Sequence, residues 1–231
     1  MINIQKINSQ EIWHEAATLL FKKLQFAGNE GKRSLLLLSG GSAISIYQIL
    51  SELIDKGNIR SDSLAVGQID ERFQPENEND INAGQIDSSK LTEILQKKQI
   101  PFYQIPQTGN LRETSFNYDK LLKKLFKTYD YHLAVLGIGQ DGHTAGLLRG
   151  YRMEWDKDRM VAGFENRGEF KQRITITPKV FGMLDYALVA VLGLEKKAVV
   201  EKIINQESGD INNLPGLLIH KIKEVDLESN I

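Results

Sequence analysis

The sequence contains no cysteine, and its four histidines lie far apart. The absence of cysteine excludes a disulfide framework, a cysteine nucleophile and a thiolate-bound metal. None of the histidines, His14, His132, His143 and His220, belongs to a His-Glu-x-x-His pair of the kind that binds zinc. We therefore predict no metal site.

A strong charge of either sign is also missing. The 29 basic and 30 acidic side chains nearly cancel, so the composition favours neither a nucleic acid nor a membrane surface as a partner. The apolar runs are too short to cross a bilayer. The first residues lack the basic, apolar and small-residue regions of a signal peptide. Together these features predict a cytoplasmic protein.

With 231 residues, of which 41% are apolar, the chain can bury a large core, and we expect a single domain covering residues 1–231. Four apolar runs predict buried strands at residues 34–38, 63–69, 131–139 and 186–194. Helical spacing predicts helices over residues 9–27, 44–55, 88–98, 113–126 and 195–204, with a further one after Pro178. Because parallel strands need crossover connections, this alternation predicts an α/β fold with a mostly parallel sheet.

In such folds ligands bind beyond the carboxyl ends of the strands. Three polar stretches directly follow predicted strands, at residues 39–42, 70–72 and 137–143. Because these ends meet at one edge of a parallel sheet, the three stretches are the first candidates for a functional site.

The first stretch, Ser39, Gly40, Gly41 and Ser42, lies between a strand and a helix. The N–H groups at a helix start lack partners within the helix, and the helix dipole favours an anion there. The glycines let a phosphate approach the backbone, and the serine hydroxyls add donors. The alternative is a tight turn in which Ser42 is the N-cap, and the sequence favours neither.

The second stretch places two carboxylates and an arginine after a strand. Arg72 offers a bidentate fork for an anion, while Asp70 can hydrogen-bond a sugar hydroxyl or orient a base. Asn82 is close enough in sequence to join them. Taken alone, a solvated loop is the simpler interpretation.

Two further cations follow the same pattern. Arg173 begins the alternating strand RITIT, and Lys196 follows the fourth predicted strand, so both can add charge for a phosphate at this edge. Lys197 carries the same charge and could bind the phosphate in place of Lys196. For each of these cations, an ordinary position on the surface is the alternative.

The third stretch, LGIGQDGHTAG at residues 136–146, has its glycines in the G-x-G-x-x-G spacing of a dinucleotide-binding loop. That motif is expected in the first strand-helix unit, with an acidic residue at the end of the next strand. Here it comes late, and the charged segment 152–159 leaves no suitable buried strand after it. The pattern therefore disfavours a dinucleotide site.

The other interpretation of this stretch uses its side chains. A glycine-rich loop containing Gly139 and Gly142 can hold His143 close to a substrate, and an imidazole titrates near neutral pH, as a general base requires. Asp141 would order the loop or polarise the imidazole. The sequence does not decide whether the two side chains meet.

Taken in order, these segments resemble the 6-phosphogluconolactonases and, more distantly, the glucosamine-6-phosphate deaminases and isomerases of the same superfamily. The similar segments are LSGGS at 38–42, DER at 70–72, the Asn82 region, LGIGQDGHTA at 136–145, RITIT at 173–177 and GLEKK at 193–197. The resemblance implies a three-layer α/β/α fold of modified Rossmann type, a phosphorylated sugar lactone as the partner, and no metal or organic cofactor. A monomer and a small homo-oligomer both remain open.

Two positions favour the lactonase branch. Deaminases typically have a glutamate five residues after the histidine of this motif, where this chain has Leu148, and they tend to have DEY in place of DER. The chain also departs from lactonases, with GGSAI for GGSTP, TAGLLRG for TASLFP and Gln74 for a valine. Three alternatives stay open: a sugar-phosphate deaminase or isomerase, a non-catalytic sugar-phosphate sensor, and a dinucleotide-binding oxidoreductase.

The activity that the resemblance implies is hydrolysis of 6-phospho-D-glucono-1,5-lactone to 6-phosphogluconate, in the oxidative pentose phosphate pathway. His143 would deprotonate the attacking water and then protonate the ring oxygen, with Asp141 and Asp70 beside it.

The same resemblance divides the binding roles. The phosphate would lie in the serine-glycine loop with Arg173, Lys196 and Arg72. Backbone N–H groups between Gly139 and Gly142 are candidates for stabilising the tetrahedral oxyanion.

Overall fold

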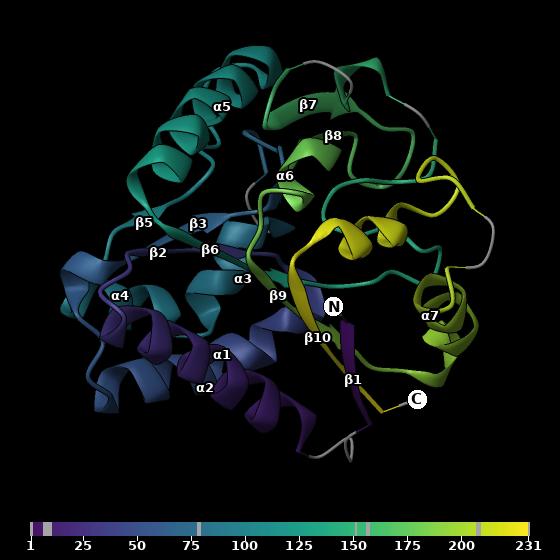
Figure 1. Ribbon diagram of the computed structural model, residues 1–231. Coiled ribbons are helices and arrows are strands. Elements are labelled where there is room, and N and C mark those ends of the chain that lie inside the picture. Colours follow the sequence, from purple (N-terminus) through teal and green to yellow (C-terminus); the bar gives the residue numbers. More distant parts are fainter. Residues whose placement is uncertain are drawn as a thin grey trace.

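The computed structural model describes residues 2–6, 11–77, 80–150, 152–155, 158–206 and 209–230. Its centre is a seven-stranded sheet in the order β1-β10-β9-β6-β2-β3-β5, in which every neighbouring pair is parallel (Figure 1). The strands are β1 (Ile2–Lys6), β2 (Ser34–Leu38), β3 (Leu64–Gln68), β5 (Phe102–Tyr103), β6 (Tyr131–Leu136), β9 (Tyr186–Val191) and β10 (Glu224–Ser229).

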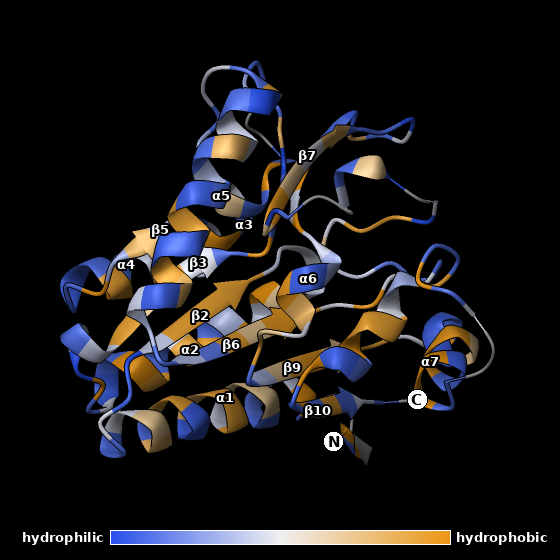
Figure 2. Cartoon of the chain, turned by 45° about the horizontal axis from the view of Figure 1, so that its top comes forward, coloured by the Kyte–Doolittle hydropathy of each residue, from blue (hydrophilic) through white to orange (hydrophobic). Residues whose placement is uncertain are grey.

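Helices cover both faces of this sheet. One face carries α1 (Ile12–Asn29), α2 (Ile44–Lys56), α3 (Asn82–Ser88) and α4 (Leu91–Lys97); the other carries α5 (Leu111–Thr128), α6 (Pro178–Phe181) and α7 (Lys197–Ile204). Apolar residues colour the strands in Figure 2, and hydrophilic residues lie on the outer sides of α1 and α5.

Strand β2 shows why both faces must be covered. Its side chains alternate between two cores, Leu35 and Leu37 packing in the core beneath α5, and Leu36 and Leu38 in the core beneath α1 and α2. All four are buried. A strand that is apolar throughout is stable only between two helical layers, so the predicted three-layer α/β/α fold is confirmed.

A second, smaller sheet was not predicted. It is antiparallel, has the order β4-β8-β7, and consists of β4 (Asp70–Arg72), β8 (Gln172–Ile176) and β7 (Val161–Glu165). The RITIT segment therefore pairs with DER and not with the main sheet. Since β4 and β8 are about a hundred residues apart in sequence, no local pattern indicates that they pair.

The predicted helices differ from the observed ones at several points. Helix α3 was not predicted, and the helix expected over residues 88–98 is reduced to α4, because Lys90 adopts a left-handed φ of +64° between the two. Helix α1 begins at Ile12, and residues 9 and 10 of its predicted start lie outside the described residues. No helix within the described ranges combines the length and the apolar character needed to cross a membrane.

Strand β10, which lies between β1 and β9 in the main sheet, contains a buried acidic side chain. Glu228 on β10 has no exposed surface, and within the described part of the chain neither of its carboxylate oxygens has a hydrogen-bond partner. Burial, together with the charges of Asp226 and Glu15, raises the pKa of Glu228 to about 7. The folded protein therefore keeps a proton on this group at a pH where the unfolded chain has released it.

This group gives stability a specific pH dependence. Its folded pKa is raised, so its contribution is fully present below about pH 4 and declines as the pH rises to about 7. We expect the free energy of unfolding of the wild-type protein to fall by an amount on the order of 1–3 kcal/mol between pH 4.5 and pH 8 because of this group. In Glu228→Gln this part of the decrease should be absent. Urea unfolding at the two pH values measures this difference. The exposed Glu30→Gln serves as the control, and an unchanged pH slope for Glu228→Gln would contradict the assignment.

Candidate active site

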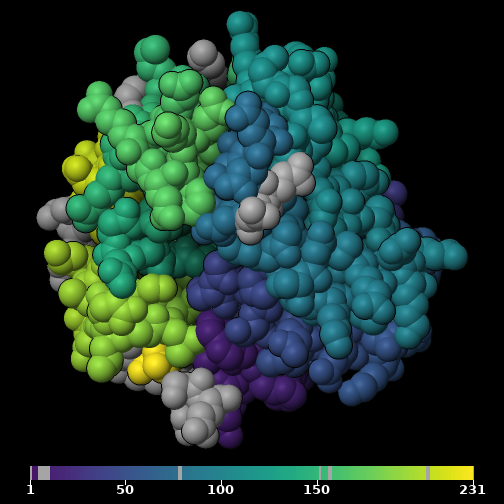
Figure 3. Space-filling model, turned by 180° about the vertical axis from the view of Figure 1, so that it is seen from behind, coloured from purple at the N-terminus to yellow at the C-terminus, as the bar shows by residue number. Residues whose placement is uncertain are grey.

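A cavity of about 310 Å³ lies beyond the carboxyl ends of the central strands, at the lower end of the volume range of small-molecule sites. Figure 3 shows this face, where segments from distant parts of the sequence surround a hollow. The lining residues are Ser39, Gly40, Gly41, Ser42, Asp70, Arg72, Asn82, Gly137, Ile138, Gly139, His143, Ala145, Arg173 and Lys196. The structure thus brings together all the predicted site residues except Asp141 and Gly142.

The serine-glycine loop follows β2 and forms one wall of the cavity. A Cβ atom on Gly40 would lie 2.2 Å from Asn82 Oδ1, so only glycine allows the loop to lie against that side chain. Gly41 has a left-handed φ of +71°. Ser39 lines the cavity, and its buried hydroxyl has no hydrogen-bond partner in the described structure.

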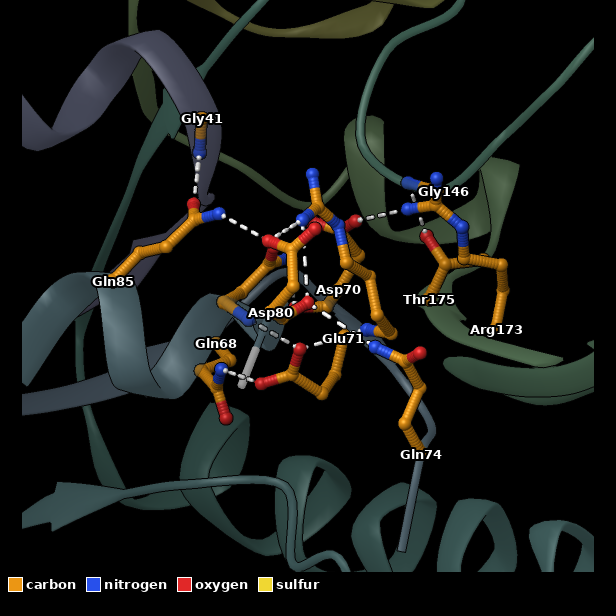
Figure 4. A network of polar contacts seen from close by, with 12 residues as sticks. Gly41, Gln68, Asp70, Glu71, Gln74, Asp80, Gln85, Gly146, Arg173 and Thr175 are labelled. Atoms are coloured by element: carbon orange, nitrogen blue, oxygen red, sulfur yellow. Dashed lines mark hydrogen bonds and ion pairs between the residues drawn. The ribbon is translucent and has the colours of Figure 1, made fainter. Parts of the chain in front are cut away.

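The N-cap role considered for Ser42 is wrong. A short 3-10 turn over Gly41–Ala43 precedes α2, and no side chain caps either element. The Gly41 N–H donates instead to Gln85 Oε1 (2.8 Å), and the Gln85 amide donates to Asp80 Oδ1 (3.0 Å), as Figure 4 shows.

The loop after β6 holds His143 and Asp141 together. Their Nδ1 and Oδ1 atoms are 2.6 Å apart, and Asp141 Oδ1 also accepts from the His143 N–H (3.2 Å). Partial burial opposes ionisation of Asp141, but the charge and hydrogen bonds of His143 hold the pKa of that carboxyl below its usual value. The Nδ1 atom is therefore engaged, and Nε2 is the ring nitrogen left for a substrate.

Gly139 is required at its position by the imidazole. A Cβ atom there would lie 2.2 Å from His143 Nδ1 and 2.8 Å from Asp141 Oδ1. The Gly139 N–H donates to the His143 carbonyl (2.9 Å). The backbone and the ring are thus packed on each other, which restricts the orientation of the imidazole.

We expect Gly139→Ala to reduce kcat for the lactone hydrolysis that the resemblance implies by about 10- to 100-fold. The reason is that the added methyl group must displace the imidazole from its contact with Asp141. Gly28→Ala is the control: it lies on α1, does not line the cavity, and its added Cβ would meet only Ser63 Oγ, at 3.8 Å. Steady-state kinetics of both variants test this. Equal losses of kcat would show that the effect does not depend on the contact with the imidazole.

Gly142 does not line the cavity. It has a left-handed φ of +84°, its carbonyl accepts from the Gly216 N–H (2.8 Å), and an added Cβ would meet Leu214. Its N–H donates to the Gly139 carbonyl (2.9 Å). The structure therefore gives Gly142 no place in the cavity lining, and its positive φ serves the turn.

The interpretation of this loop as a dinucleotide site fails for a topological reason. No α-helix follows the glycines before β7, among the residues that the structure describes there. The next strand, β7, begins after segment 152–159, is antiparallel and belongs to the small sheet, so it is not the parallel strand that a dinucleotide site needs. A strand-helix-strand unit is thus not formed.

Two arginines from the small sheet form the opposite wall. Arg72 and Arg173 are directly opposite in the β4–β8 pair, and their guanidinium carbons lie 3.9 Å and 5.3 Å from the centre of the Phe170 ring. Asp80 forms an ion pair with Arg72, and Asp70 Oδ2 lies 3.6 Å from Arg173 Nη1. The ring and the carboxylates offset the repulsion between the two cations.

Burial shifts the acid-base balance of the Asp70–Arg173 pair. Desolvation raises the pKa of Asp70, with the charge of Arg173 opposing this, and desolvation lowers the pKa of Arg173, with the charge of Asp70 opposing it. An anionic ligand in the cavity would add a second negative partner for Arg173, whose ion pair with Asp70 is loose at 3.6 Å.

The structure also decides between the two neighbouring lysines. Lys196 ends the 3-10 turn Leu194–Lys196 after β9 and lines the cavity, whereas Lys197 begins α7 and is exposed. Across the described ranges, no three His, Asp or Glu side chains are grouped in a way that would hold a metal ion.

Gly137 and Ile138, within the candidate stretch 137–143 but given no role there, also line the cavity. Ala145 lines it too and was not predicted; it has a left-handed φ of +52°, which is uncommon for a residue other than glycine. Glu71 is fully buried behind the wall and accepts four hydrogen bonds. Its place within DER was the only local signal.

The family model described as glucosamine-6-phosphate isomerases/6-phosphogluconolactonase matches residues 7–227. The chain belongs to this family. The human protein named 6-phosphogluconolactonase is 26% identical over 224 residues, covering 92% of this chain and 84% of that protein. The Xylella fastidiosa protein of the same name is 24% identical over 209 residues, covering 85% and 81%.

Solved structures of the family have the same fold. The crystal structure of 6-phosphogluconolactonase from Thermotoga maritima has a TM-score of 0.79 at 19% identity, covering 99% of each chain. The structure from Plasmodium vivax has a TM-score of 0.80 at 16% identity, covering 99% of this chain and 90% of that one. The predicted family and fold class are thus both confirmed.

Proposed function

We propose that the protein hydrolyses 6-phospho-D-glucono-1,5-lactone to 6-phosphogluconate. The observation that carries the proposal is that one cavity contains both an Asp-oriented imidazole and three cations, Arg72, Arg173 and Lys196. An anionic substrate with a reactive ester needs these two kinds of group. The names of the curated relatives support the same activity.

The phosphate is assigned to the serine-glycine loop and two of the cations. Ser39 contributes a buried hydroxyl without a partner, and the glycines of the loop let the phosphate oxygens reach the backbone. Arg173 and Lys196 approach from the small sheet and from the turn after β9. Binding energy from the phosphate would hold the lactone carbonyl near His143.

His143 is assigned the role of general base. Its Nδ1 is hydrogen-bonded to Asp141. Its Nε2 takes a proton from water as the water oxygen attacks the lactone carbonyl. When the tetrahedral intermediate collapses, the bond from this carbon to the ring oxygen breaks and Nε2 returns the proton to that oxygen. The product is the open-chain acid, and no covalent intermediate with the enzyme is needed.

The oxyanion is assigned to Arg72, the cation of the cavity that the phosphate assignment leaves free. The N–H groups of Gly139 and Gly142, which were the first candidates, both donate to carbonyls within their own loop at 2.9 Å. They are therefore unsuitable as donors, whereas the guanidinium group of Arg72 lines the cavity. Asp70 lines the same cavity and is assigned to orient a substrate hydroxyl.

The proposal describes a single-domain cytoplasmic enzyme that works as a monomer or a small homo-oligomer without a metal or organic cofactor. Its test is the hydrolysis of freshly generated lactone, measured above spontaneous ring opening, and we expect strong acceleration. Ammonia release from glucosamine 6-phosphate would instead indicate a deaminase. Binding of 6-phosphogluconate without turnover would indicate a sensor, and binding of a nicotinamide cofactor would indicate an oxidoreductase.

A further inference from the structure

We propose that Glu71 is a positioning residue, which holds the phosphate-binding half of the cavity in place without touching the substrate. The inference rests on the proposed lactone hydrolysis. Glu71 is the middle residue of β4, but its side chain points away from the cavity, and its exposed surface is zero. Figure 4 shows its carboxylate beside Gln68.

The four hydrogen bonds of Glu71 connect separate segments of the site. One oxygen accepts from the backbone N–H groups of Arg72 (2.7 Å) and Asn82 (2.6 Å). The other accepts from the Ala83 N–H (2.9 Å) and from Gln68 Nε2 (2.8 Å). A single carboxylate thus ties β4 to the first turn of α3, which has no local side-chain cap.

These bonds reach the cavity wall through Asn82. Its side-chain amide donates to the Asp70 carbonyl (3.0 Å), and its Oδ1 occupies the space where a Cβ of Gly40 would be. The position of Asn82 therefore fixes the serine-glycine loop against β4. Glu71 controls that position through the Asn82 N–H.

Behind Glu71, a buried polar chain anchors it to the rest of the fold. Gln68 Oε1 accepts from the Ile105 N–H (2.5 Å), and the Tyr118 hydroxyl donates to the Gln68 carbonyl (2.9 Å) while accepting from its N–H (2.8 Å). Gln68, the side-chain donor to Glu71, is thus held in place by bonds to two other segments. A buried network of this kind tolerates one arrangement of donors and acceptors.

The opposite half of the site is independent of Glu71. His143 and Asp141 lie on the loop after β6, and none of the hydrogen bonds of Glu71 involves that loop. Disturbing Glu71 should therefore weaken substrate binding more than it slows the proton transfers. This difference separates positioning of the binding half from a general loss of structure.

The decisive variant is Glu71→Gln. In either orientation its NH₂ group faces two N–H donors, which leaves buried groups without acceptors. We expect KM to rise about tenfold or more with kcat changed much less. The dissociation constant of 6-phosphogluconate, measured by calorimetry, should rise in parallel, and exposed Glu76→Gln should change neither quantity.

A rescue variant distinguishes positioning from loss of charge. In Gln68→Glu/Glu71→Gln, the amide introduced at position 71 donates to the carboxylate introduced at position 68, which still accepts from the Ile105 N–H. Only the Ala83 N–H then loses its acceptor, so most of the loss in KM should be recovered. Unchanged KM and dissociation constant in Glu71→Gln, or equal losses in the single and double variants, would overturn the inference.

The test also covers a variant that does not fold and a wild-type protein that shows no activity. If Glu71→Gln does not fold, Gln68→Ala replaces it, since this removes one of the four bonds; an unchanged KM in that variant would overturn the inference. If the wild-type protein does not accelerate lactone hydrolysis, the proposed function fails, and the calorimetric comparison with 6-phosphogluconate still decides whether Glu71 positions an anion site.

Discussion

His143→Ala is expected to lower kcat/KM for lactone hydrolysis by about 10²- to 10⁴-fold, with most of the loss in kcat. The reason is that His143 Nε2 is the group assigned to move the proton from water to the ring oxygen, while Nδ1 is occupied by Asp141 at 2.6 Å. The substrate itself opens spontaneously in water, so the rate must be measured with freshly generated lactone and corrected for the uncatalysed reaction.

The control for this variant is His14→Ala, because His14 is an exposed histidine on α1, away from the cavity. Asp141→Asn should have an intermediate effect, since the imidazole remains but loses its charged partner. Equal rates for wild type and His143→Ala would refute the assigned role. A rise in KM with an unchanged kcat would make His143 a binding residue.

Arg173→Gln is expected to raise KM by about 10- to 100-fold and to change kcat much less. Arg173 is largely buried in the cavity wall beside Asp70, and burial leaves its guanidinium without full solvation. A phosphate that pairs with this cation gains the same contact in the ground state and in the transition state. Its loss should therefore weaken binding uniformly.

Lys171→Gln is a matched control for the lost charge. It removes one positive charge two residues before Arg173, from an exposed side chain that does not line the cavity. A similar increase in KM in both variants would show that a long-range field, and not contact with Arg173, holds the phosphate. A loss confined to kcat in Arg173→Gln would contradict the phosphate assignment.

The fold class was predictable because its signals are local. Leu35 to Leu38 are all apolar, which requires helices on both sides of the strand, and the helical spacing of segments such as 113–126 supplies them. The small sheet was not predictable, because the pairing of Arg72 with Arg173 spans about a hundred residues and depends on register. Helix α3 was missed because its cap, Glu71, lies 11 residues away from Asn82.

For the site, the sequence alone determined which kinds of group are available: a glycine loop after a buried strand, a histidine and an aspartate on a second such loop, and cations near two further strand ends. Only the tertiary structure decided that Asp141 meets His143, that Lys196 and not Lys197 lines the cavity, and that Gly142 turns away from it. The physical reason is that side-chain type and periodicity are written along the chain, whereas the direction of a side chain depends on contacts with segments distant in sequence. For the same reason the sequence does not indicate the role of Glu71, whose carboxylate accepts from backbone N–H groups of both β4 and α3.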